Sequence, residues 1–232
     1  MKSILEKMPH LKFIMADCCH FMCLESLYEL RSVADYVIGS PAEIPGEGAP
    51  YKDVVPAMFE KDTFYNTIVE KYHASQQGCL PLSVVKMSEM ENVAQATGYA
   101  LQSVKANLGD AYADLTGMIH YGHLGHKAVF YPENNFFFDA GDFLSRYASE
   151  SDYLQWKQAL DKAVVLKRIG YTWDTQKTWR IFFTDFQMTE EKFHGVSMFI
   201  PQNPSKGNYA KYNEDIKQME WYKAVRIEGK SE

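Results

Sequence analysis

The sequence predicts an α/β fold, in which a mostly parallel sheet with flanking helices is followed by a smaller α+β region. Short apolar runs at residues 11–16, 35–39 and 80–87 alternate with longer stretches of helical pattern, and such alternation is typical of parallel sheets. Beyond about residue 115, glycine and aromatic residues become denser and the apolar runs shorten. We therefore expect a sheet-forming domain at residues 1–115 and an α+β domain at residues 116–232.

The first half can be assigned element by element. A helix end is expected before Pro9, because proline ends helices. Three prolines and two glycines predict a rigid, turn-rich loop at residues 40–50. Ser88 and Glu91 have the spacing of a capping box, which opens a helix. The expected order is helix 2–8, strand 11–16, helix 19–32, strand 35–39, loop 40–50, two helices within 51–77, strand 80–87 and helix 88–107.

The second half is expected to hold shorter, more antiparallel strands. A helix at residues 151–168 separates them, with Ser151 as its N-cap and Gly170 as its stop. The remaining expected elements are strands at residues 128–131, 136–139, 180–186 and 196–200, and a last helix at 216–225.

Composition limits the classes of function. The 232 residues are 46% hydrophobic and 23% charged, as in ordinary globular proteins. The net charge of −6 argues against a nucleic-acid partner and suits a protein that attracts basic peptides. No apolar stretch approaches the roughly 20 residues of a membrane span, and residues 1–15 do not form a signal peptide. Four cysteines, three of them at positions 18, 19 and 23, give no disulfide framework.

The most informative segment is residues 17–25, which read DCCHFMCLE directly after the first apolar run. A strand that ends in Asp and Cys and runs into a helix exposes these side chains at the carboxyl edge of the sheet, where many α/β enzymes hold a nucleophile. If the helix begins at Cys19, its unsatisfied N–H groups favour the thiolate and help to bind an oxyanion. The alternative for Cys19 is a small buried hydrophobe.

Three further motifs follow this segment. They are YELR at residues 28–31, DYVI at 35–38 and SPAEIPG at 40–46. Together with Asp17, Cys19 and Glu25, they resemble the clostripain family of cysteine peptidases, closely over residues 11–60 and more loosely beyond. The resemblance implies a caspase-like fold and a bacterial thiol protease that cleaves after Arg or Lys.

The resemblance implies roles for three residues. Cys19 matches the nucleophile, because Glu25 and the YELR segment fix the register, whereas Cys18 stands where the family usually has alanine. Asp17 would line the pocket for the basic side chain before the scissile bond, and Glu47 would place a second carboxylate beside that pocket. From the residues alone, Asp17 can equally be a helix N-cap.

The general base is missing from this pattern. A cysteine peptidase needs a histidine that accepts the thiol proton and returns it to the leaving amine. In the caspase-like group this histidine lies upstream of the cysteine, and the only upstream histidine here is His10, which is expected at the wrong end of the strand. His20 adjoins the cysteine and points elsewhere. The resemblance therefore implies a partner, an N-terminal (light) chain or segment that carries the histidine and without which the sheet is incomplete on its N-terminal side.

Other interpretations stay open. Because His20 and Cys23 depart from the family pattern, the chain could be a catalytically inactive, truncated homologue that acts as a binding or structural module. Histidines at positions 120, 123 and 126 have a spacing that metal ligands use, but the glycines between them favour an exposed connection. The sequence requires no cofactor. The resemblance allows Ca²⁺ and implies a bacterial protein that is secreted, periplasmic or attached to the cell surface.

Overall fold

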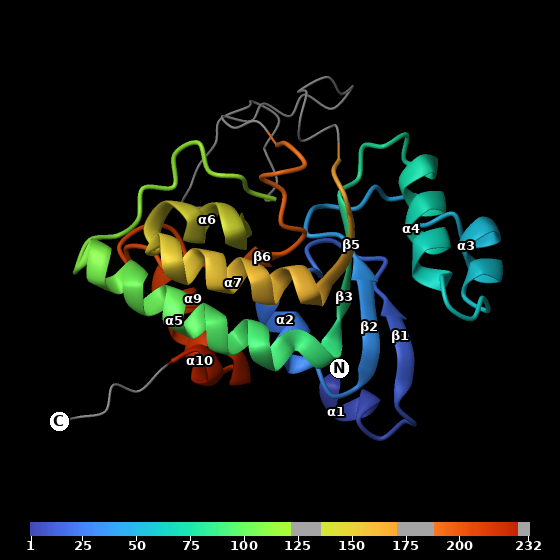
Figure 1. Ribbon diagram of the computed structural model, residues 1–232, viewed down its shortest axis with the longest axis horizontal. Coiled ribbons are helices and arrows are strands. Elements are labelled where there is room, and N and C mark those ends of the chain that lie inside the picture. Colours follow the sequence, from blue (N-terminus) through green and yellow to red (C-terminus); the bar gives the residue numbers. More distant parts are fainter. Residues whose placement is uncertain (122–135, 171–187, 227–232) are drawn as a thin grey trace.

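A four-stranded sheet lies between two layers of helices in the computed structural model, which describes residues 1–121, 136–170 and 188–226 (Figure 1). The strands, in spatial order, are β1 (Leu11–Met15), β2 (Ala34–Gly39), β3 (Leu82–Lys86) and β5 (Val164–Arg168). This architecture confirms the predicted α/β fold class.

The sheet is mixed because one strand is reversed. β1 and β2 are parallel, whereas β3 runs antiparallel to both β2 and β5. The reversal follows from the connection between β2 and β3: α3 (Tyr51–Ala57) and α4 (Phe64–Ser75) form a helical pair that returns the chain to the edge where β2 ended. β1, β2 and β5 therefore share one direction, and their carboxyl ends meet at the same edge of the sheet.

Successive residues of the central strands face opposite layers, as the two-residue period of a strand requires. Val37 and Val85 belong to the larger core, whereas their neighbours Ile38 and Val84 belong to the core under α3 and α4. Figure 1 shows α3 and α4 on one side of the sheet and α5, α6 and α7 on the other. The helices that contribute to the larger core are α2 (Leu24–Glu29), α5 (Met90–Leu108), α6 (Ala140–Tyr147), α7 (Glu150–Ala163) and α10 (Glu220–Val225).

The helix predicted at residues 151–168 is wrong at its C-terminal end. α7 ends at Ala163, and the chain continues directly into β5, which pairs with β3. Two successive valines at the start of β5 favour the extended conformation. β5 is thus part of the main sheet, and Trp156 of α7 lies in the same core as Val37. The described parts of residues 116–232 therefore share a sheet and a core with residues 1–115, so the predicted domain division does not coincide with a division of the core.

Smaller differences concern helix starts. Ser149 rather than Ser151 caps α7, and a 3₁₀ turn at Met87–Glu89 precedes α5 in place of the predicted capping box. The predicted strands at residues 128–131 and 180–186 lie outside the described residues. The other elements are α1 (Lys2–Leu5), the antiparallel pair β4 (Phe138–Asp139) and β6 (Ser197–Met198), α9 (Tyr209–Asp215) and a 3₁₀ turn at Ile216–Gln218.

Candidate active site

The segment between β1 and α2 lies at the carboxyl edge of the sheet and forms a loop. The predicted helix start at Cys19 is wrong, because α2 begins at Leu24 with Cys23 as its N-cap. Backbone hydrogen bonds to the end of β2 and to the loop after it hold the segment in place, and the chain turns at His20, whose φ is 56°. These bonds run from the N–H groups of Ala16, His20 and Met22 to the carbonyls of Ile38 (2.8 Å), Ala42 (3.0 Å) and Ser40 (3.2 Å).

The side chain of Cys19 is exposed and contacts the loop at residues 40–50. The backbone N–H of Ile44 donates to its Sγ across 3.2 Å, and the thiol faces the carbonyl oxygen of Ile44 at 3.8 Å. A backbone N–H of this loop thus contacts the sulfur where the N–H groups of a helix N-terminus were expected. The neighbouring loop therefore takes the place of the expected helix.

The two nearby cysteines are less suited to nucleophilic attack. The side chain of Cys18 is exposed, but partial desolvation by its surroundings, with the neighbouring Cys19 and the charge of Asp17, raises its pKa above the usual value. Burial raises the pKa of Cys23 to about 12, and its thiol donates to the hydroxyl of Ser26 at 3.1 Å. Both remain thiols at neutral pH, and only thiolates attack efficiently. This chemistry argues against Cys18 and Cys23 as the nucleophile.

Asp17 is the centre of a hydrogen-bond cluster beside the cysteines. Its Oδ1 accepts from the hydroxyl of Tyr72 at 2.6 Å, and its Oδ2 accepts from the backbone N–H of Ala49 at 3.0 Å and from the hydroxyl of Tyr51 at 2.7 Å. Burial alone would raise the pKa of this carboxyl, but the three donors outweigh it and hold the pKa below its usual value. The N-cap interpretation is wrong, since the cap of α2 is Cys23. Asp17 is an ionised carboxylate enclosed by donors.

Gly48 allows the loop to close over this carboxylate. Its φ is +65°, and a Cβ atom built there would lie 2.6 Å from Oδ2 of Asp17. Glycine adopts this conformation without strain and leaves room for the oxygen. Glu47, the second predicted pocket acid, is exposed on the same loop directly before Gly48. The fold thus brings the loop that carries Glu47 onto Asp17.

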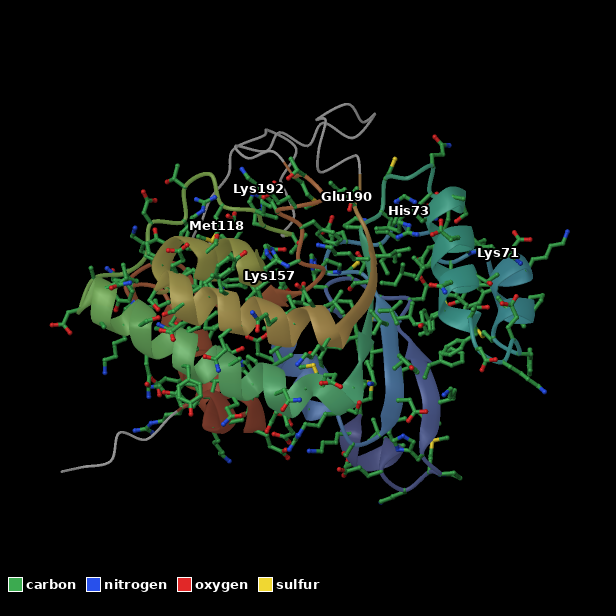
Figure 2. The ribbon with its side chains drawn as sticks, in the orientation of Figure 1. Lys71, His73, Met118, Lys157, Glu190 and Lys192 are labelled. Atoms are coloured by element: carbon green, nitrogen blue, oxygen red, sulfur yellow. The ribbon has the colours of Figure 1, made fainter. Side chains whose placement is uncertain are left out.

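The histidines of the described residues are engaged away from the thiol. The ring of His20 contacts the carbonyl of Pro41 through Nδ1 at 3.2 Å and stacks on Phe137. His10 lies before the start of β1 and pairs with Asp35 at 2.9 Å; the strand puts about 16 Å between its two ends. His73, on the side of α4 that faces β5, donates from Nε2 to the carbonyl of Ile169 at 2.8 Å (Figure 2).

The last described pair of histidines is buried. Burial lowers the pKa of His120 to about 3, and His123 and His126 lie outside the described residues. His194 binds Asp139 through Nδ1 at 2.7 Å and faces the hydroxyl of Tyr153 through Nε2 at 3.2 Å. Burial would raise the pKa of Asp139, but the charge and hydrogen bonds of His194 lower it. The His194–Asp139 pair lies in the core and holds the start of α6, where Asp139 is the N-cap.

The described residues contain neither a cluster of metal-binding side chains nor a helix that could span a membrane. Within the described residues, no group of three or more His, Cys, Asp or Glu side chains is arranged to bind a metal ion. In the same ranges, no helix is long and apolar enough to cross a bilayer.

A model of the clostripain family matches residues 1–229. The chain belongs to the clostripain family. This clostripain-family chain has the caspase-like arrangement of a central sheet flanked by helices, with the candidate nucleophile at the carboxyl end of β1. No curated protein matches it significantly.

Solved structures of bacterial cysteine proteases are similar to this chain. A cysteine protease of B. fragilis is 29% identical, with a TM-score of 0.78 over 97% of this chain and 91% of that one. An inactive protease zymogen from Parabacteroides distasonis is 29% identical, with a TM-score of 0.77 over 97% of this chain and 61% of that one. A secreted cysteine protease from Bacteroides thetaiotaomicron, solved with an irreversible peptide inhibitor, is 27% identical, with a TM-score of 0.73 and coverages of 97% and 61%.

The sequence did not reveal the residues that surround Asp17. Tyr51 and Tyr72 lie 34 and 55 positions from it, and neither belongs to a motif that indicates this contact. Ile44, whose N–H reaches Cys19, was recognisable only as part of the SPAEIPG loop. For the tyrosines the one available signal was the predicted pair of helices after that loop.

Proposed function

We propose that this chain supplies the nucleophile of a cysteine endopeptidase that cleaves after Arg or Lys. The main support is the arrangement around Cys19: an exposed thiol at the carboxyl edge of the sheet, an N–H donor at its sulfur, and the Asp17 carboxylate two residues before it. Relatives named as cysteine proteases add to this support. A buried or partly buried carboxylate binds a cationic side chain strongly, because the charge is otherwise unpaired.

The reaction follows from the chemistry of the thiolate. Sulfur of Cys19 attacks the carbonyl carbon after the basic residue, and nearby backbone N–H groups bind the oxyanion. The C–N bond then breaks as a histidinium gives its proton to the leaving amine, which leaves a thioester on Cys19. Water, whose proton passes to the same histidine, hydrolyses the thioester and restores the thiolate.

The histidine is proposed to come from an N-terminal segment or light chain outside these 232 residues. His10, His20 and His73 each bind groups other than the thiol, which supports this origin. The position of β1 supports it as well, because within the described residues β1 pairs only with β2. A strand added at its open edge would run to the same carboxyl edge as Cys19 and cover an otherwise exposed strand.

Processing and export are part of the same proposal. One relative is described as an inactive zymogen and another as secreted. We therefore expect a precursor that is cut into a light and a heavy chain and acts outside the cytoplasm. Peptides and proteins with accessible Arg or Lys are the expected substrates.

The experiment compares the 232-residue chain alone with the chain supplied with its upstream segment, in cis or as a separate polypeptide. Alone, it should show no measurable turnover of a Lys- or Arg-containing peptide, because general acid–base help contributes about 10²–10⁴-fold. The added segment should restore activity. Turnover by the isolated chain would place the base within this sequence, and inactivity of both preparations would favour a binding or structural module.

A further inference from the structure

The carboxylate of Asp17 has room for one more hydrogen-bond donor. A carboxylate offers about four acceptor positions, two on each oxygen. Among the residues that the structure describes, Ala49 and Tyr51 donate to Oδ2, whereas only Tyr72 donates to Oδ1. One position therefore remains, on Oδ1.

The two oxygens of Asp17 also differ in what surrounds them. Oδ2 is closed by the buried backbone of Ala49 and by Gly48, whose Cα lies so near that an added Cβ would come within 2.6 Å of it. On Oδ1 the donor is Tyr72, a side chain only 1% exposed. Tyr51, at the start of α3, is 53% exposed. Contact with Asp17 raises the pKa of Tyr51, so its hydroxyl keeps its proton and remains a donor.

Lysine and arginine make different demands on such a carboxylate. Arginine binds most strongly in a fork, with two parallel N–H groups that donate to the two oxygens at once. A lysine ammonium is a compact charge that needs only one carboxylate acceptor and turns its other protons to water or carbonyls. With Oδ2 saturated, the fork cannot form unless the hydroxyl of Tyr51 leaves.

We propose that Tyr51 is a specificity-determining residue that makes this pocket select lysine over arginine before the scissile bond. The inference rests on the proposed function, since it takes Asp17 as the acid of that pocket. Glu47 does not create the same bias, because an exposed carboxylate attracts either cation.

The two tyrosines provide a matched comparison. Tyr51→Phe frees an acceptor on Oδ2 and permits the arginine fork, so arginine should gain relative to lysine. Tyr72→Phe frees a second position on Oδ1, which already has one, while Oδ2 stays saturated. Both variants lose one hydroxyl donor to Asp17, but only the first should change the preference.

The test uses two peptides that carry the same thiol-reactive ketone and end in lysine or arginine. Their second-order rates of labelling Cys19 are measured on the whole enzyme, in wild type, Y51F and Y72F. Wild type should react faster with the lysine peptide. Y51F should raise the arginine-to-lysine ratio about tenfold, equivalent to ~1.4 kcal/mol, and Y72F should change it by less than about twofold.

The outcomes separate this inference from the proposed function. If Y51F leaves the ratio unchanged, or Y72F changes it equally, Tyr51 does not set specificity even though Cys19 is labelled. Faster reaction of wild type with the arginine peptide likewise overturns the inference. If neither peptide labels Cys19 in any variant, the proposed function fails and the inference fails with it.

Discussion

The backbone N–H of Ile44 donates to Sγ of Cys19 across 3.2 Å, so the loop after β2 orients the candidate nucleophile. The same loop places Gly48 and Ala49 against the carboxylate of Asp17, and Tyr51 follows them at the start of α3. One stretch of chain therefore contacts both the thiol that would react and the acid that would bind the substrate. Changes in this loop should affect reactivity and specificity together.

Cys19→Ala should abolish the peptidase activity of the complete enzyme and leave its fold intact. The side chain is exposed, so the free energy of unfolding should change by no more than about 1 kcal/mol. Peptide hydrolysis and urea denaturation measure the two effects. Cys18→Ala is the control and should be nearly silent, because Cys18 is exposed and its raised pKa keeps it a thiol. Full turnover by the Cys19 variant would exclude Cys19 as the nucleophile.

Asp17→Asn should weaken cleavage after basic residues by about two orders of magnitude, through loss of a charge-assisted contact. Asparagine also replaces one carboxylate oxygen with an NH₂ group, which cannot accept the hydrogen bonds that this oxygen accepts. Part of the loss of activity will therefore come from disturbance of the loop. The measurement is kcat/KM for a basic and a neutral peptide in parallel. Equal losses for both peptides would show that Asp17 only supports the loop.

Gly48→Ala should destabilise the loop by about 1–3 kcal/mol, because alanine is strained at a φ of +65° and its Cβ would overlap Oδ2 of Asp17. Activity toward basic substrates should fall with it. Gly46→Ala is the matched control on the same loop, since an added Cβ there meets nothing within 4 Å. Thermal unfolding and hydrolysis of a Lys peptide should separate the two variants. Equal behaviour would mean that the loop does not close on Asp17 as described.

Stability should fall as the pH rises from about 4.5 to 7. Burial raises the pKa of Glu25 from 4.5 to about 7, although the N–H of Phe199 donates to its Oε1 at 2.8 Å. In that window the folded state keeps a proton that the unfolded state has released, so the free energy of unfolding decreases with pH. Glu25→Gln should flatten this slope and gain stability above pH 7.

Denaturation of wild type, Glu25→Gln and Glu47→Gln at pH 5, 6, 7 and 8 tests that dependence. Glu47 is exposed, and its variant should keep the slope of wild type. A Glu25 variant whose slope matches wild type would show that Glu25 is ionised in the fold throughout this range.

Local patterns predicted most of the sheet. The apolar runs that became β1, β2 and β3, and the prolines and glycines of the loop at residues 40–50, specify structure through neighbours in the chain. The start of α2 was missed because residues 19–23 form a loop, held by hydrogen bonds to the backbone carbonyls of Ala42 and Ser40. No local sequence pattern reveals hydrogen-bond partners that lie in the loop after a different strand.

The strand β5 and the donors to Asp17 show the same limit. Residues 164–168 continue a helical pattern in sequence, but they form a strand because they pair with β3. Tyr72 reaches Asp17 only because α4 packs against the sheet. Cys19 and Asp17, in contrast, were selected from a short motif, and the structure places them at one edge of the sheet beside the same loop.

The most direct test of Cys19 as the nucleophile is to map the site of covalent labelling. The complete enzyme is treated with an irreversible peptide ketone that ends in lysine, then digested and analysed by mass spectrometry. The adduct should lie on Cys19, form in wild type and disappear in Cys19→Ala. An adduct on Cys18, Cys23 or Cys79 in place of Cys19, or labelling that persists in the alanine variant, would contradict it.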